Sequence, residues 1–106
     1  MIEIKEEIVI GYKNVAEFPD YTMYEIYING RLNDDALHMD FNKVTNKYCV
    51  AMDGPWGTAK EGIDIEITYN HKDTKEEMED ELRRDYQCYL NHVFINPTNI
   101  RVEELL

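Results

Sequence analysis

Four side chains that can ligate a metal ion recur along residues 81–92. Glu81, Asp85, Cys88 and His92 are spaced by four, three and four residues, which places them on one stripe of a helix. Cys88 and His92 lie one turn apart and have the chemistry of half a zinc site. One helix face seldom supplies a whole site, and no CxxC or HxxxH pattern accompanies this one. The spacing therefore favours a polar flank of the helix over a metal centre, and we expect no bound metal.

Other arrangements that could support catalysis are equally incomplete. Cys88 and His92 could act as nucleophile and base, but the surrounding acids would raise the pKa of the thiol and keep it protonated. Asp64 and Glu66 share one face of a predicted strand, as a pair of catalytic carboxylates would. The chain has no glycine-rich phosphate loop. Residues 53–57 are instead expected to form a rigid Gly-Pro turn from which Trp56 covers the edge of the core. We expect no catalytic residue and no cofactor, and hence a protein that is not an enzyme.

A long amphipathic helix is predicted over residues 74–93. Apolar side chains recur at steps of four, four, three and four residues, which fits one face of a helix with about 3.6 residues per turn: Met78, Leu82, Tyr86, Tyr89 and Val93. Thr74 followed by Glu77 has the pattern of a capping box. The opposite face is charged, so the helix should bury a single stripe against a sheet.

Alternating apolar residues predict strands on both sides of that helix. Residues 2–10 alternate isoleucines with charged residues, and Glu6 interrupts the apolar side as a bulge or a rim position would. Residues 12–20 are expected to form a loop. Residues 21–28 are rich in tyrosine and isoleucine on both sides, which favours a strand at the centre of the sheet or with one face at an interface.

The middle of the chain is less regular. Asn29-Gly30 is a strong turn signal. Residues 34–44 fit either a short helix or a strand. The strand is preferred because the following residues have the pattern of a hairpin loop with Asn46 in the left-handed conformation. Three more segments have strand periodicity: residues 48–52, 63–69 and 99–104.

The predicted fold is a single acidic α+β domain spanning residues 1–106. It has a mostly antiparallel β-sheet of five to six strands, with the one long helix (about residues 74–93) packed on one face. Cys49 and Cys88 are expected to be buried or half-buried thiols, because nothing in the sequence indicates secretion. No apolar run approaches the roughly 18 residues of a membrane span, and a cytoplasmic protein is expected.

Charge is the most unusual property of the chain. Eleven Lys and Arg residues face twenty-two Asp and Glu residues, giving a net charge of -11. The acids fall in two blocks, since residues 1–40 hold nine acids and three bases, and residues 61–81 hold nine acids and two bases. Such a field repels nucleic acid and anionic membranes and attracts basic proteins. We therefore expect neither nucleic-acid nor membrane binding.

Aromatic residues set among these acids suggest a binding surface. Tyrosine and tryptophan dominate interface hot spots and stack on arginine. The chain has eight tyrosines and one tryptophan, and the aromatic residues expected to be exposed are Tyr12, Tyr21, Tyr27, Tyr48 and Trp56. The hypothesis is a small inhibitor that blocks a basic, nucleic-acid-handling protein such as a nuclease, in the manner of immunity proteins or phage anti-CRISPR antagonists. The predicted partner-binding residues are Glu3, Glu7, Tyr21, Tyr27, Asp34, Asp35, Trp56, Asp64, Glu66, Glu76 and Asp80. The alternative is a homo-oligomeric assembly module, a homodimer for example, that uses residues 21–28 as its seam.

Overall fold

The computed structural model describes the backbone of residues 2–33, 37–53, 67–92 and 95–106. Side chains are described for residues 7–33, 37–52, 70–91, 95–97 and 99–106. Seven strands and one helix follow each other along this part of the chain: β1 (Ile2–Glu17), β2 (Tyr21–Ile28), β3 (Arg31–Leu32), β4 (Leu37–Asn42), β5 (Lys47–Asp53), β6 (Ile67–Lys72), α1 (Lys75–His92) and β7 (Ile95–Leu105). The α+β fold expected from the sequence is confirmed.

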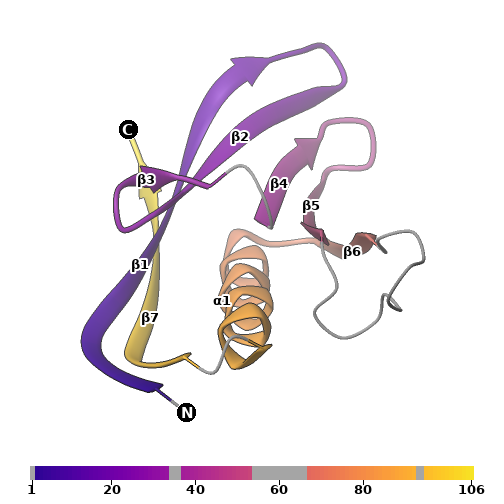
Figure 1. Ribbon diagram of the computed structural model, residues 1–106. Coiled ribbons are helices and arrows are strands. Elements are labelled where there is room, and N and C mark those ends of the chain that lie inside the picture. The colour runs from indigo at the N-terminus through magenta and orange to yellow at the C-terminus, as the bar shows by residue number, and fades with distance from the viewer. Residues whose placement is uncertain (1, 34–36, 54–66, 93–94) are drawn as a thin grey trace.

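The sheet curls around the helix (Figure 1). Its strand order is β6-β5-β4-β2-β1-β7, with β3 paired to one end of β2. All neighbouring strands are antiparallel except β1 and β7, which run parallel. α1 approaches β7 near one edge of the sheet and β5 and β6 near the other edge. The face that carries α1 is therefore concave, and the opposite face is convex.

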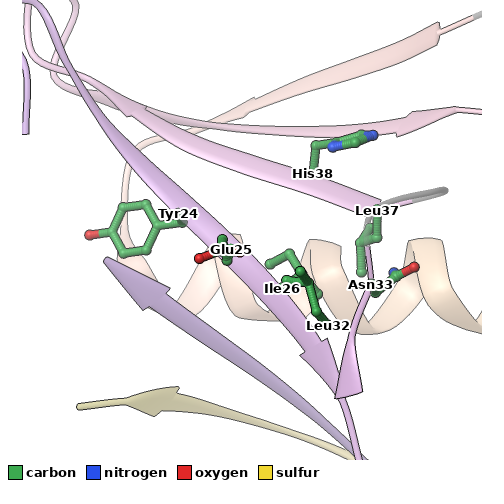
Figure 2. Close-up of a pocket in the computed structure, with 7 residues that line it drawn as sticks. All are labelled: Tyr24, Glu25, Ile26, Leu32, Asn33, Leu37 and His38. Carbon is green, nitrogen blue, oxygen red and sulfur yellow. The ribbon is translucent and has the colours of Figure 1, made fainter. Parts of the chain in front are cut away.

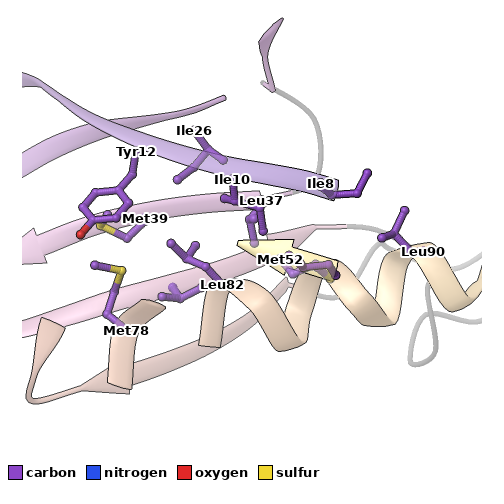
Figure 3. Close-up of a cluster of buried hydrophobic side chains, with 12 residues drawn as sticks. Ile8, Ile10, Tyr12, Ile26, Leu37, Met39, Met52, Met78, Leu82 and Leu90 are labelled. Carbon is purple, nitrogen blue, oxygen red and sulfur yellow. The ribbon is translucent and has the colours of Figure 1, made fainter. Parts of the chain in front are cut away.

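The core lies between α1 and the concave face (Figure 3). Strand alternation sends Ile8, Ile10 and Tyr12 of β1 toward the helix, where each is at most 7% exposed. Met78 and Leu82 of α1 are completely buried against them. Burial of one such side chain contributes about 1.5–3 kcal/mol, so the packing of α1 on this face is a principal source of stability.

The helix begins where the sequence indicates. The Thr74 hydroxyl oxygen accepts a hydrogen bond from the Glu77 backbone N–H at 3.2 Å, as in a capping box. The Glu77 carboxylate accepts from the Thr74 hydroxyl at 3.1 Å. Of the predicted apolar stripe, Met78 and Leu82 are buried and Tyr86 and Tyr89 are half-buried, while Val93 lies outside the described residues.

The turn predictions are also confirmed. Asn29 and Gly30 have φ angles of 50° and 82°, which suit the tight turn between β2 and β3. Asn46 has a φ of 60° in the loop between β4 and β5. Residues 37–42 form a strand, as preferred, and β2 lies inside the sheet between β1 and β4.

Three sequence-based predictions are wrong. Residues 12–17 belong to β1, because they pair with β2 across a bulge between Asn14 and Ala16. Tyr12 is only 1% exposed, since it points into the core from this longer strand. Cys88 is an exposed thiol, while Cys49 is half-buried as expected, and both are free.

The other strand boundaries are largely as expected. The register between β1 and β7 shifts between Ile4 and Glu7, where Glu6 suggested an irregularity. β7 begins earlier than predicted, at Ile95. The predicted strand 63–69 corresponds to β6 from Ile67 onward, and its first part lies outside the described residues. No helix in the described part of the chain is long and apolar enough to cross a membrane.

Candidate protein-binding face

The convex side of the sheet is the best candidate for a binding surface, because no described helix covers it (Figure 1). Strand alternation turns every second residue of β2 toward this side, namely Tyr21, Met23, Glu25 and Tyr27. We call the convex surface around these four side chains the open face. Its central row is thus an aromatic, apolar and acidic series on one strand.

The aromatic end of the open face is built by the turn between β1 and β2. The rings of Phe18 and Tyr21 stack with centroids 4.6 Å apart and an interplanar angle of 18°. Phe18 and Met23 are each 38% exposed. Large apolar side chains that remain this accessible beside tyrosines are typical of the central residues of protein interfaces.

Three carboxylates border this apolar row without forming an ion pair to any described base: Asp20, Glu25 and Asp40. Lys13 lies opposite Glu25 in the β1–β2 register, but the two form no ion pair. Partial burial raises the pKa of Asp40, while nearby His71 acts in the opposite direction. The open face therefore presents acids that a basic partner can still neutralise.

Elsewhere, most described bases are already bound to acids. Seven of them lie in ion pairs: Lys43, Lys47, Lys72, Lys75, Arg83, Arg84 and Arg101. Some pairs join elements that are distant in the sequence, such as Lys75 of α1 and Glu104 of β7 at 2.6 Å, and others lie within α1, such as Asp80 and Arg83. Among the described side chains, the acids outside these ion pairs include those of the open face and Glu76 and Glu77 in the first turn of α1.

The predicted partner-binding residues fall on different parts of the molecule. Tyr21 and Tyr27 lie on the open face, both half-buried. Glu7 of β1 accepts a hydrogen bond from Asn99 and pairs with Arg101 at 3.3 Å. Glu76 and Asp80 are exposed on α1, which the sheet separates from the open face, and Asp80 pairs with Arg83. The remainder lie outside the described residues or side chains: Glu3, Asp34, Asp35, Trp56, Asp64 and Glu66.

The stripe of potential metal ligands on α1 separates into a buried and an exposed part. Glu81 is 7% exposed, and its carboxylate lies 3.3 Å from Lys72. Burial raises the pKa of Asp85, and a hydrogen bond with Glu81 adds to the shift. The hydrogen bond with Asp85 lowers the pKa of Glu81, and Lys72 reinforces this despite the burial. In this pair, Asp85 therefore holds its proton more strongly than Glu81 does.

A metal site is not visible in this stripe. Cys88 is exposed, and the side chain of His92 lies outside the described part. Among the described residues, no group of three or more His, Cys, Asp or Glu side chains is arranged to hold a metal ion.

Sequence reasoning missed a row of reactive residue types across three strands. The registers place Asp40 of β4 opposite Cys49 of β5, and Cys49 opposite His71 of β6. Burial, together with Asp40, raises the pKa of the Cys49 thiol. The thiol therefore stays protonated, and its place between acid and imidazole is not the order of a catalytic triad. Only the strand registers bring these residues together, so no local sequence signal could have found them.

Comparison of the chain with family models, curated proteins and solved structures gives no match. The residues of this chain are therefore the basis for assigning its function.

Proposed function

We propose that this protein binds the basic surface of another protein through the open face, and that it thereby inhibits a partner that handles nucleic acid. The observation that carries the proposal is the row of partly accessible aromatic and methionine side chains on β2, bordered by carboxylates that form no ion pair with a described base. Arginine is the natural counterpart, because its guanidinium stacks on tyrosine and pairs with carboxylates.

Net charge supports the class of partner. At -11, the chain attracts a cationic surface over a distance of about a Debye length, roughly 8–10 Å near physiological salt. A nuclease or another nucleic-acid-binding protein has such a surface where it receives phosphates. An acidic protein seated there would exclude the nucleic acid by occupying the same cationic groups.

The experiment is affinity capture by the intact protein, followed by mass spectrometry. Basic proteins are expected to bind at about 50 mM NaCl and to be released before about 500 mM, because salt screens the attraction. The captured partner should lose its binding to DNA or RNA when this protein is added. A complex that survives high salt unchanged, or a captured partner that is itself acidic, would contradict the proposal.

Two matched variants locate the binding face. Glu25→Gln with Asp40→Asn removes two charges from the open face, and Glu76→Gln with Asp80→Asn removes two charges from α1. The first variant should weaken capture at least about fivefold, equivalent to roughly 1 kcal/mol, and the second should change it little. A larger loss in the second variant would place the partner on the helix.

The alternative function, a homodimer joined along residues 21–28, is constrained by the position of β2. Tyr21–Met23 already pair with β4 on one side, and β1 runs along the other side. Residues 21–23 therefore offer no free strand edge, and a seam made by the side chains of residues 21–28 requires the open faces of the two copies to meet. Light scattering at high protein concentration tests this, since a strictly monomeric mass would exclude the assembly module.

A further inference from the structure

The sheet splits between β2 and β4 (Figure 2). β4 pairs with β2 only at Tyr21–Met23, and β3 pairs only with Tyr27 and Ile28. Residues 24–26 of β2 thus have no partner residue on β3 or β4. Residues 37–39 of β4 likewise pair only with β5. Two short stretches of strand edge therefore face each other across an interruption inside the sheet.

A pocket of about 330 Å³ occupies this interruption. Consecutive residues of β2 line it, although consecutive residues of a strand point to opposite faces. A pocket can touch all of them only where the strand edge itself is open. The lining residues are Tyr24, Glu25, Ile26, Leu32, Asn33, Leu37 and His38 (Figure 2).

The pocket combines an apolar floor with unused polar groups. Ile26 and Leu37 are 2% and 0% exposed, and Leu32 is 50% exposed at the rim. The Nδ2 atom of Asn33 is buried and has no hydrogen-bond partner among the described residues. An unsatisfied buried donor is unfavourable, so a ligand that brings an oxygen acceptor to Nδ2 would gain binding free energy.

The backbone of residues 24–26 adds a second requirement for the ligand. The Asn33 N–H donates to the Ile26 carbonyl at 2.8 Å, so the carbonyl of Ile26 points toward the interruption. In a strand, the N–H and the C=O of one residue point to the same side, so those of Tyr24 and Ile26 both face this edge. The Ile26 carbonyl is already bonded to Asn33, and the pairing of Met23 with Asp40 engages the Tyr24 N–H, so a ligand can use the Tyr24 carbonyl and the Ile26 N–H. An extended peptide is the ligand that matches such an edge, because it offers alternating donors and acceptors.

Charge selects the kind of peptide. Glu25 lines the pocket and forms no ion pair with a described base. We propose that an extended basic segment of the protein partner docks in this interruption, bonds its backbone to the Tyr24 carbonyl and the Ile26 N–H of β2, and places a cationic side chain on Glu25. A carbonyl of the segment accepts from Asn33 Nδ2, and an apolar side chain rests on Ile26 and Leu37. The inference deepens the proposed function and rests on it.

A defined peptide tests the inference with the full-length, ¹⁵N-labelled chain. The probe is a capped pentapeptide of alternating valine and arginine. Two peptides serve as controls: alternating valine and glutamate, and the arginine peptide with its central backbone amides methylated. The arginine peptide should shift the amide resonances of Tyr24, Ile26 and the Asn33 side chain, and both controls should bind at least about tenfold more weakly. Equal binding of either control, or shifts confined to other residues, would overturn the inference.

Substitutions provide an independent readout. Asn33→Leu keeps the shape of the side chain and removes the donor, so the arginine peptide should bind at least about fivefold more weakly. Asn91→Leu, at an exposed position on α1, is the matched control and should leave the affinity unchanged. Unchanged affinity in Asn33→Leu, with the native spectrum retained, would overturn the assigned contact.

The outcomes separate this inference from the proposed function. Capture of a basic partner that depends on Glu25 and Asp40, with no peptide bound between β2 and β4, would leave the function standing and reject the docking mode. Peptide binding without capture of any basic protein would reject the function and keep the groove. Shifts of the same amides on raising the concentration of the free chain would identify a second copy as the occupant and overturn the inference.

Discussion

The carboxyl pair formed by Glu81 and Asp85 links one buried proton to the pH dependence of stability. Burial and the hydrogen bond with Glu81 raise the pKa of Asp85 to about 8. Asp85 in the unfolded chain titrates near its ordinary value of 3.8. Between these values the native state holds a proton that the unfolded state has released, so the free energy of unfolding falls as pH rises through this window.

Asp85→Asn tests this linkage. The asparagine amide is neutral at every pH and can donate to Glu81 as the protonated carboxyl does. From pH 5 to pH 8, the free energy of unfolding should therefore fall more for the wild type than for the variant. The expected difference is on the order of 1 kcal/mol, which allows for the partial exposure of Asp85 to solvent. Urea titrations at the two pH values measure it. Parallel pH profiles would show that Asp85 is ionised in the native state.

The hydroxyl group of Tyr12 forms a second partly buried polar contact, this time between β1 and α1. It donates to Glu79 Oε2 at 2.5 Å, and burial followed by this bond raises the pKa of Tyr12. Tyr12→Phe should lower the free energy of unfolding by about 1.5–3 kcal/mol at pH 7, because the lost bond involves a charged acceptor. Tyr24→Phe is a suitable control, since no hydrogen bond of that hydroxyl is found in the described part. Equal losses in both variants would mean that ring packing, not the bond to Glu79, decides the effect.

At the scale of elements, the close packing of β1 against β7 depends on Gly11, which has no side chain where Leu105 of β7 lies. A Cβ atom added at Gly11 would lie 2.6 Å from Leu105 Cδ1 and 2.8 Å from its Cγ. Gly11→Ala should therefore destabilise the protein by roughly 1–3 kcal/mol through overpacking. The double variant with Leu105→Ala should recover much of this loss relative to Leu105→Ala alone. A denaturation-based double-mutant cycle measures the coupling, and simple additivity would exclude the steric explanation.

Element prediction from the sequence succeeded where the signal is local. The helix at residues 75–92 follows from apolar spacing and the Thr74 cap, and the turn at Asn29-Gly30 follows from backbone preferences. The length of β1 was missed, because residues 12–17 are held by pairing with β2 and not by their own alternation. The same reason applies to the candidate site. Tyr21 and Tyr27 were found on β2, but the interruption beside Asn33 depends on where β4 leaves β2.

The whole molecule has more negative charge than its ion pairs neutralise. With a net charge of -11, repulsion among the acids opposes the compact state. Raising NaCl from about 20 to about 500 mM should increase the urea midpoint of unfolding, because screening weakens this repulsion. Near pH 5, which is close to the sequence pI of about 4.5, protonation lowers the net negative charge, so the effect of salt on the midpoint should be smaller. A midpoint that falls with salt would mean that the ion pairs, and not the excess acids, dominate.

The parallel pairing of β1 with β7 has a consequence for the order of events during synthesis. Glu7 and Asn99, which are joined by a hydrogen bond, are 92 positions apart in the chain. β7 follows every other described element and supplies buried Ile100. While β7 is still inside the ribosome, β1 lacks this neighbouring strand, and the core side chains that β7 would cover remain exposed to water. The nascent chain should thus acquire protease resistance only after residue 105 has emerged, as a late and cooperative step.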